Sequence, residues 1–266
     1  MKSNPASLKE KIKKSKALVG GWITMGDPVV SEIMAQAGFE WLAVDMEHSA
    51  LTLEQVQNQV RIIELSGVPS LVRVGENNPN LIKRVMDTGT QGVIVPMVNS
   101  RAEAIRAVQS VHYPARGIRG VGLARAQKYG FGFSQYRDWL KQKSVVIVQI
   151  EHIRAVENID EILQVGGIDA FIVGPFDLSG SLGFPGEFDH PRVVQALKVV
   201  MNASKRFNIP AGFHVIPPDT DLLLNKVRQG YKFLAFSLDI LLLGTICRNS
   251  LAQVKKGLNR NRKALK

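Results

Sequence analysis

The 266-residue sequence contains a single cysteine, Cys247. One cysteine excludes an intrachain disulfide and a cysteine-based zinc site, and its position predicts a buried thiol in the last helix. No apolar stretch approaches the roughly 18 uninterrupted residues of a membrane span. Residues 1–16 carry lysines but lack the apolar core and cleavage site of a secretory signal. These absences predict a cytoplasmic protein without a membrane-spanning segment.

The sequence also lacks an excess of basic residues outside its two ends, although its formal net charge is +11. Residues 1–16 sum to +5 and residues 255–266 sum to +6, so residues 17–254 are formally neutral. Basic ends can bind polyanions without sequence preference. These ends carry no interleaved aromatic residues, so specific nucleic-acid binding is not expected. We expect solvated ends.

Short apolar runs recur along nearly the whole chain, and the intervening stretches mostly have the pattern of helices. Alternation of strand and helix predicts a parallel sheet, and eight such units predict a closed (β/α)8 TIM barrel. The length suits one such domain, 1–266, with basic extensions at 1–16 and 255–266. The eight runs are residues 17–23, 41–47, 70–75, 92–98, 145–151, 170–178, 211–216 and 233–239.

The longest irregular stretch is residues 112–133, which contains six glycines or prolines. Loops of this length inside a compact domain are usually functional or mobile. Its basic residues Arg116, Arg119, Arg125 and Lys128 suit an anionic ligand or a neighbouring subunit. Helices are predicted over 53–66, 101–111, 156–165, 191–207, 219–229 and 241–258.

Two acids, Glu151 and Asp177, end the fifth and sixth runs. Active sites of such barrels lie at the carboxyl ends of the strands, and neighbouring strands are about 4.8 Å apart. The two carboxylates could therefore chelate one hard divalent cation, with Mg²⁺, Mn²⁺ or Co²⁺ favoured over a structural zinc. Gln149, two residues before Glu151, points to the same face. The alternative is a pair of solvated or ion-paired acids at the rim.

Three further residues are candidates. His48 follows the second run and could act as a general base near neutral pH, or could be a rim histidine without a function. Arg73 interrupts the third run, where a buried guanidinium needs an anion. That anion could be a substrate carboxylate, or Glu47 in a structural ion pair. Asp87 has the spacing of an ordinary residue at a helix end.

The sequence lacks the residues that two common types of barrel chemistry require. A Schiff-base aldolase needs a lysine that projects inward from a strand, and none of the eight runs contains lysine. Phosphate-binding barrels usually have glycine-rich loops after strands seven and eight. Here those ends read VIPP and SLD, so phosphate recognition at this place is not expected.

Several segments, in order, resemble the HpcH/HpaI family of class II, metal-dependent pyruvate aldolases. The resemblance covers residues 20–251. The segments that carry it are AGFEW at 37–41, DMEH at 45–48, VPMV at 95–98, YP at 113–114, RGIRGVG at 116–122, VQIE at 148–151 and GPFDLS at 174–179.

The resemblance implies roles for these residues. Glu151 and Asp177 would ligate the cation, and Gln149 would help to hold substrate. His48 would be the catalytic acid and base, and Asp87 would raise its basicity.

The same resemblance implies that Arg73 stabilises the enolate, that Arg73 and Asp177 contact substrate, and that Phe176 contributes a backbone contact. Many relatives have a small residue at the Phe176 position. The segment 212–215 does not match the family pattern, which leaves the acceptor specificity open. Family members form hexamers, trimers of dimers that exchange their last helix.

The leading hypothesis is a reversible aldol cleavage of a 2-keto-4-hydroxy acid into pyruvate, or a close 2-oxo acid, and an aldehyde. A second hypothesis is a CoA-ester lyase of the malyl-CoA or citryl-CoA type. The DMEH segment belongs to the aldolase branch and favours the first. A third is a catalytically silent barrel that binds polyanions through its basic ends.

Overall fold

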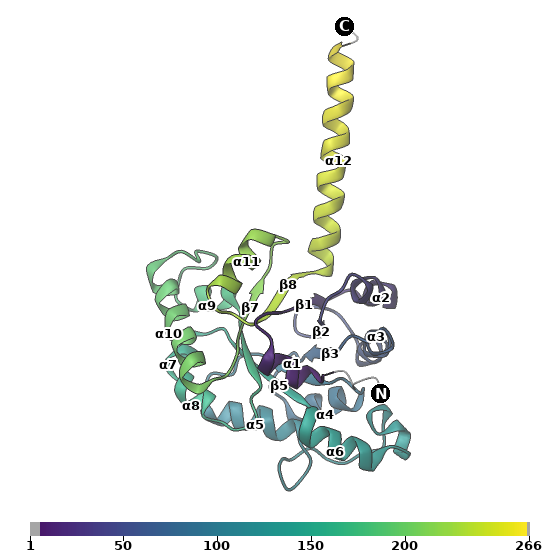
Figure 1. Ribbon diagram of the computed structural model, residues 1–266, viewed down its shortest axis with the longest axis vertical. Helices are drawn as coiled ribbons and strands as arrows, with labels where there is room; N and C mark the ends of the chain where they lie inside the picture. Colours follow the sequence, from purple (N-terminus) through teal and green to yellow (C-terminus); the bar gives the residue numbers. More distant parts are fainter. Residues whose placement is uncertain (1–5, 265–266) are drawn as a thin grey trace.

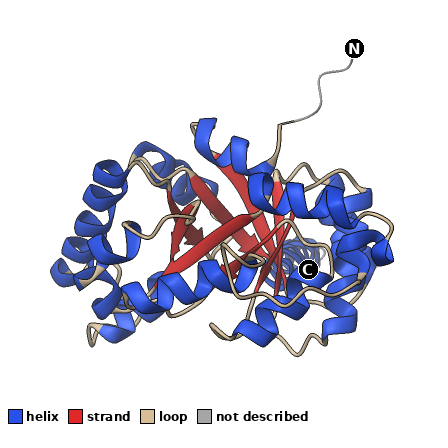
Figure 2. Cartoon of the chain, turned by 90° about the horizontal axis from the view of Figure 1, so that it is seen from below, coloured by secondary structure: helices blue, strands red, loops and turns tan. Residues whose placement is uncertain are grey.

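The computed structural model describes residues 6–264, so Lys2 and Lys266, two of the terminal basic residues, lie outside the described part. Within it, eight parallel strands pair in chain order and close between β8 and β1. Figure 2 shows these strands surrounded by helices. The predicted (β/α)8 barrel is confirmed. The strands are β1 (Leu18–Ile23), β2 (Trp41–Asp45), β3 (Ser70–Arg73), β4 (Gly92–Val95), β5 (Val145–Ile150), β6 (Ala170–Val173), β7 (Ala211–Val215) and β8 (Phe233–Leu238).

Local sequence signals start the outer helices. Asp27 and Asn78 each accept a hydrogen bond from a backbone N–H of the first turn, and each precedes a proline at the first helical position. Thr52 and Gln55 form a capping box. The main outer helices are α2 (Pro28–Gln36), α3 (Leu53–Leu65), α4 (Pro79–Asp87), α5 (Arg101–Val111), α6 (Phe133–Lys143), α10 (Pro191–Phe207) and α11 (Thr220–Arg228).

The single helix predicted over 156–165 is wrong. The structure has two short helices, α7 (Ile153–Glu157) and α8 (Ile159–Leu163), which meet at Asn158. The Asn158 side chain donates a hydrogen bond to the carbonyl of Asn99, 2.8 Å away. This hydrogen bond fixes the junction between α7 and α8 against the segment that follows β4.

The sixth predicted strand, 170–178, is also too long. β6 ends at Val173, and the helix α9 (Pro175–Ser181) begins after Gly174, with Pro175 at its first position. Asp177 therefore lies in the first turn of a helix and not at the end of a strand. Asp177 was expected to lie at the same height in the barrel as Glu151, and it approaches the site from α9 instead of from β6.

The predicted irregular stretch 112–133 contains a short 3-10 segment, η1 (Arg125–Gly130), before α6 begins. Its arginines have partners within the chain. Arg119 forms an ion pair with Asp87 at 2.5 Å, and Arg125 forms one with Glu64 at 2.5 Å. These two arginines stabilise the loop against α3 and α4.

The amino-terminal end is not simply solvated. Residues Leu8–Lys14 form the helix α1, whose Leu8 and Ile12 are 1% and 2% exposed. They join the core cluster inside the barrel that also contains Trp41 and Phe233. Lys9 forms an ion pair with Asp169 at 3.1 Å. The expectation of a solvated end is therefore wrong for this segment, because the positions i and i+4 are apolar and close the barrel from its amino end.

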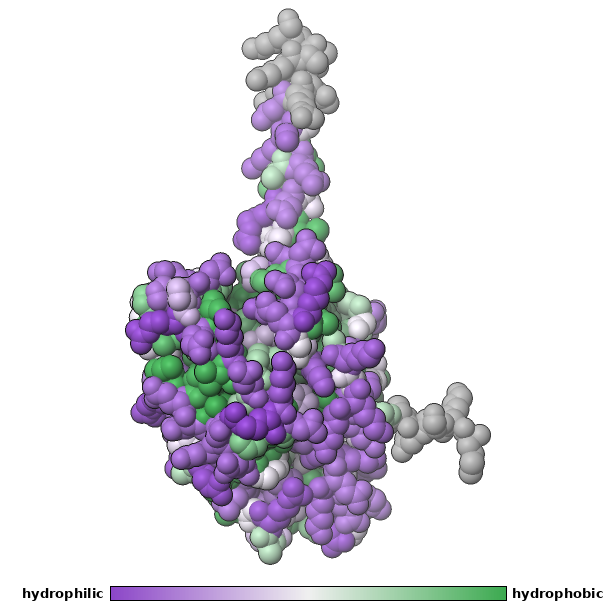
Figure 3. Space-filling view, turned by 60° about the vertical axis from the view of Figure 1, so that its left-hand side comes forward, coloured by the Kyte–Doolittle hydropathy of each residue, from purple (hydrophilic) through white to green (hydrophobic). Residues whose placement is uncertain are grey.

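The last helix, α12 (Asp239–Ala264), projects away from the barrel (Figure 1). Figure 3 shows hydrophobic residues among the polar ones along it. Cys247 is exposed, so the prediction of a buried thiol is wrong for the single chain. No helix among residues 6–264 has the length and apolarity needed to cross a membrane. The exposed large apolar residues of α12 are Ile240, Leu243, Ile246, Leu251, Val254 and Leu258.

We predict that Ile12→Ala destabilises the protein by about 2–5 kcal/mol, because it leaves a cavity at the closed end of the barrel. Urea unfolding followed by circular dichroism measures this free energy. The matched control is Lys13→Ala, which truncates an exposed neighbour on the same helix. Equal unfolding free energies for the two variants would contradict the packing of α1.

Candidate active site

A cavity of about 340 Å³ opens among the carboxyl ends of the strands. Its lining includes five of the residues singled out from the sequence: His48, Arg73, Gln149, Phe176 and Asp177. A larger cavity of about 690 Å³ lies between β7, α10 and α11. The two cavities share Pro175, Phe176, His214 and Ile216, so they adjoin at these residues.

Arg73 is fixed by Asp45. The Arg73 Nε and Nη2 atoms donate to the two Asp45 carboxylate oxygens at 2.8 and 2.6 Å. Nη1 lies 3.3 Å from Glu47 Oε2, so the structural ion pair with Glu47 exists but is the longer of the two. Burial alone would raise the pKa of Asp45, but the hydrogen bonds from Arg73 hold it below its ordinary value. Sequence reasoning did not assign this role to Asp45, although the strand register pairs it with Arg73.

Glu151 is buried directly after β5 and is held by neutral groups. Its Oε1 accepts from the backbone N–H of Met97 at 2.7 Å, and its Oε2 accepts from the Gln149 amide. Met97 has a left-handed φ of 52°, an unfavourable conformation that directs its N–H to the acid. Burial raises the pKa of Glu151, and the negative charge of Asp177 adds to this effect.

The acid Glu47 belongs to the same group. Burial raises its pKa to about 7, and the charges of Glu151, Asp45 and Asp177 add to this rise while Arg73 opposes it. Four carboxylates thus meet a single close guanidinium. Neither Glu151 nor Asp177 forms an ion pair with a basic side chain within residues 6–264.

This excess of negative charge fits a hard divalent cation, whose preferred ligands are carboxylate oxygens. The described residues contain no group of three or more His, Cys, Asp or Glu arranged around one metal position. A cation between Glu151 and Asp177 would therefore keep positions open for other oxygen ligands. Open positions are typical of catalytic rather than structural metals.

His48 lies at the mouth of the cavity. Its side chain is 64% exposed, and Nε2 is 3.8 Å from Glu47 Oε2. Its backbone N–H donates to Asp45 at 3.3 Å, which fixes the turn after β2. The histidine can reach a substrate in the cavity while remaining open to solvent or to another molecule.

Asp87 is not near His48 within this chain. It ends α4, and helices of this fold run back toward the amino ends of the strands. Its carboxylate accepts from Arg119 at 2.5 Å and from Gln127 at 3.4 Å. The structure therefore brings together six of the seven predicted site residues and leaves Asp87 at the opposite end of the barrel.

Sequence reasoning also missed Trp22 and His214, which line the cavity from β1 and β7. The Arg73 guanidinium carbon lies 4.4 Å from the centroid of a Trp22 ring. The Trp22 and His214 rings are 5.4 Å apart. Strand alternation could have identified them, because Trp22 and His214 each lie two residues after an inward-facing glycine (Gly20 and Gly212) and therefore also face inward.

A (β/α)8 barrel that gathers acids, an amide and an arginine at the carboxyl ends of its strands has the architecture of an enzyme. The chain belongs to the HpcH/HpaI aldolase/citrate lyase family, whose sequence model matches residues 18–244.

Relatives cover almost the whole chain. It is 33% identical over 259 residues to the 2-keto-3-deoxy-L-rhamnonate aldolase of Escherichia coli (strain K12), which spans 97% of this chain and 95% of that protein. The structure of an HpcH/HpaI aldolase/citrate lyase family protein from Burkholderia cenocepacia J2315 is 32% identical, with a TM-score of 0.86 and coverage of 93% and 98% of the two chains. An HpcH/HpaI aldolase from Desulfitobacterium hafniense DCB-2 is 31% identical, with a TM-score of 0.86 and coverage of 94% and 97%.

We predict that Gly174→Ala weakens divalent-cation binding by about tenfold to a hundredfold, the usual effect of disturbing a ligand's surroundings. A Cβ at this position would lie 2.8 Å from Glu151 Oε2 and 3.4 Å from the Gln149 amide nitrogen, so the acid would have to move. Isothermal titration with Mn²⁺ measures the affinity. Gly180→Ala, in the helix that follows Gly174, is the control, because its Cβ would meet nothing within 4 Å. Equal affinities in both variants would contradict a cation at Glu151.

Proposed function

We propose that this protein catalyses the reversible aldol cleavage of a 2-keto-4-hydroxy acid into pyruvate, or a close 2-oxo acid, and an aldehyde. The observation that carries the proposal is Glu151. It is buried without a basic partner in the described chain, and it lies beside Asp177 and Gln149, with Arg73 close by. The relative named as a 2-keto-3-deoxy acid aldolase supports a 2-keto acid substrate.

Glu151 and Asp177 would hold the cation, for which we propose Mg²⁺, Mn²⁺ or Co²⁺. When bound, the cation supplies Lewis-acid polarisation of the substrate's keto group. Gln149 keeps the Glu151 carboxylate in place and orients the 2-oxo acid, and the backbone at Phe176 bounds the same position. Arg73, fixed by Asp45, supplies a permanent positive charge where the enolate develops.

His48 moves the proton in this scheme. During cleavage it takes the proton of the C4 hydroxyl, the C3–C4 bond breaks, and the electron pair remains as the enolate of the 2-oxo acid. The aldehyde leaves from C4, and protonation of C3 completes the keto acid. In the addition direction the same residue returns the proton to the new hydroxyl.

We also propose that the protein is a homo-oligomer, a hexamer built as a trimer of dimers that exchange α12. The exposed apolar residues of α12 support this, because no other part of the described chain covers them. Asp87 lies far from His48 of its own chain, so its proposed effect on basicity requires His48 of a neighbouring copy. The exposure of His48 at the mouth is compatible with such an arrangement.

The two alternatives differ in support. A CoA-ester lyase would turn over malyl-CoA and leave free keto acids unchanged, and no feature of the cavity favours it. The polyanion-binding alternative is weakened by α1, where Lys9 is engaged with Asp169 and the apolar residues are buried. A cytoplasmic location is part of the proposal, because a free thiol such as Cys247 suits a reducing compartment.

The proposal is tested by deuterium exchange into the methyl group of pyruvate, which requires no knowledge of the aldehyde. We predict exchange with added Mg²⁺, Mn²⁺ or Co²⁺ and none with EDTA. Glu151→Gln should lower the rate at least about a hundredfold, or about 2.7 kcal/mol of transition-state stabilisation. Glu157→Gln, an exposed acid nearby in sequence, is the control. Exchange without any cation, or none with every cation, would reject the proposed reaction.

The position of Asp87 gives a second prediction. His48→Ala and Asp87→Asn subunits should each be impaired alone, but mixed assemblies should recover about a quarter of the sites, because random pairing unites an intact His48 with an intact Asp87 at that frequency. Aldol turnover of refolded equimolar mixtures measures this. Mixing His48→Ala with Glu151→Gln is the control and should recover nothing, since both residues serve the same chain's cavity. Absence of recovery in the first mixture would disprove the shared site.

A further inference from the structure

Three polar groups at the carboxyl half of the barrel have no hydrogen-bond partner within residues 6–264: His214 Nε2, Trp22 Nε1 and Ser237 Oγ. They come from β7, β1 and β8, on the side of the barrel away from Glu151 on β5. A buried polar atom without a partner costs free energy, so such groups call for an explanation. The reaction described above uses none of them.

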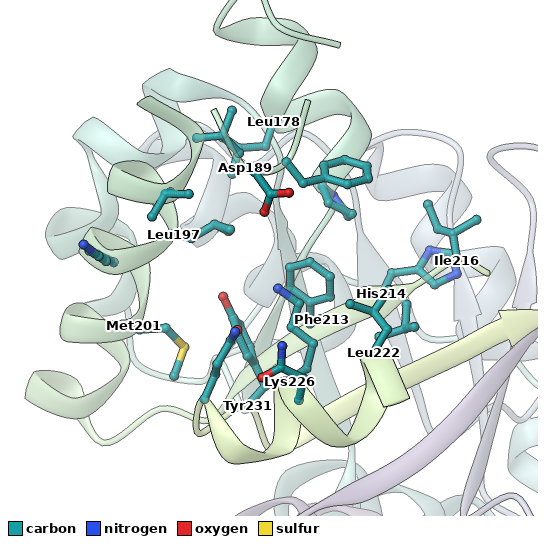
Figure 4. A pocket seen from close by; sticks show the side chains of 18 of the residues that line it. Leu178, Asp189, Leu197, Met201, Phe213, His214, Ile216, Leu222, Lys226 and Tyr231 are labelled. Atoms are coloured by element: carbon teal, nitrogen blue, oxygen red, sulfur yellow. The ribbon is translucent and has the colours of Figure 1, made fainter. Parts of the chain in front are cut away.

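His214 lines the cavity that contains the proposed catalytic residues, and it also borders the larger cavity. Figure 4 shows it with Ile216 at one edge of the larger cavity, away from Met201 and Tyr231. Its ring is tilted by 55° to that of Trp22. The imidazole therefore lies at the junction of the two cavities, beside the space that extends beyond the proposed catalytic residues.

The imidazole is neutral. Burial lowers the pKa of His214 to about 3, and the positive charge of Arg73 contributes to the shift. The nearby Ser237 backbone and the negative charge of Asp45 would raise this pKa, but burial prevails.

The backbone near these three groups is irregular. Ser237 has a left-handed φ of 58°, which is unfavourable for a residue with a side chain. The register between β1 and β8 shifts between Gly20 and Trp22, in the same part of the barrel. Irregularities of this kind are common next to active sites, where they redirect groups.

The tautomer with its proton on Nδ1 leaves Nε2, the ring nitrogen without a partner, as the hydrogen-bond acceptor. In the neutral ring, Nε2 then carries a lone pair and can only accept. The adjacent Trp22 Nε1–H can only donate. A hydroxyl group can satisfy both, since it donates one hydrogen bond and accepts another.

We propose that His214 selects the acceptor aldehyde by accepting a hydrogen bond from its hydroxyl group, and that Trp22 donates to the same oxygen. The enzyme therefore prefers aldehydes hydroxylated next to the carbonyl over their alkyl analogues. This assignment rests on the proposed aldol reaction.

The test compares glycolaldehyde with acetaldehyde, which differ by one hydroxyl group, as acceptors for pyruvate. We expect the wild-type enzyme to favour glycolaldehyde by about tenfold to a hundredfold in kcat/KM, since an analogue that lacks the hydroxyl leaves buried groups unpaired. His214→Leu should reduce this ratio to near one, while exchange of the pyruvate methyl protons continues. His190→Leu, which removes a histidine outside the linings of both cavities, should keep the wild-type ratio.

Two polar variants guard against a folding defect in His214→Leu. His214→Gln places an amide near the position of Nε2 and should retain most of the preference. His214→Asn places its amide near Nδ1 and should lose it. An unchanged ratio in the Leu and Asn variants, with exchange intact, overturns the role of His214 alone. Absence of pyruvate exchange in the wild-type protein overturns the aldol reaction and this assignment with it.

Discussion

The ion pair between Asp45 and Arg73 is the interaction on which the candidate site depends. The two residues are register partners on β2 and β3, so the barrel itself sets their spacing. A guanidinium that is 7% exposed would be costly to bury without a carboxylate that meets it through two hydrogen bonds. The pair fixes a positive charge inside an otherwise acidic ring, where it also lowers the proton affinity of Glu47.

The site has two halves of different character. On β5 and α9, Glu151 and Asp177 concentrate negative charge, and Glu151 accepts hydrogen bonds from the Met97 backbone and the Gln149 amide. On β7 and β1, His214 and Trp22 are neutral, and His214 Nε2 and Trp22 Nε1 have no hydrogen-bond partner within the described chain. The division matches a substrate with an anionic keto-acid end and an uncharged aldehyde end, so one cavity can treat the two products of a cleavage differently.

The alternation of strands and helices was sufficient to predict the barrel and the side of it on which the candidate residues gather. Gln149 and Glu151 share a face by simple alternation, whereas the pairing of Arg73 with Asp45 required the strand register. The remainder depended on tertiary context. Asp177 reaches the site from a helix that Pro175 starts early, which a run of apolar residues conceals. Met97 adopts a left-handed backbone conformation that presents its N–H to Glu151, and nothing in the residue type predicts this conformation.

Burial explains the other misses. Two apolar side chains in a seven-residue lysine-rich segment are too few for a periodicity argument, yet they close the barrel as α1. The closed end and the open end therefore offer different attachment points. A tag on the α1 side lies at the closed end, away from the cavity of the candidate site, whereas a tag after α12 extends the helix whose apolar residues are exposed. Immobilisation through the exposed face of α1 would thus leave the cavity at the carboxyl ends of the strands open.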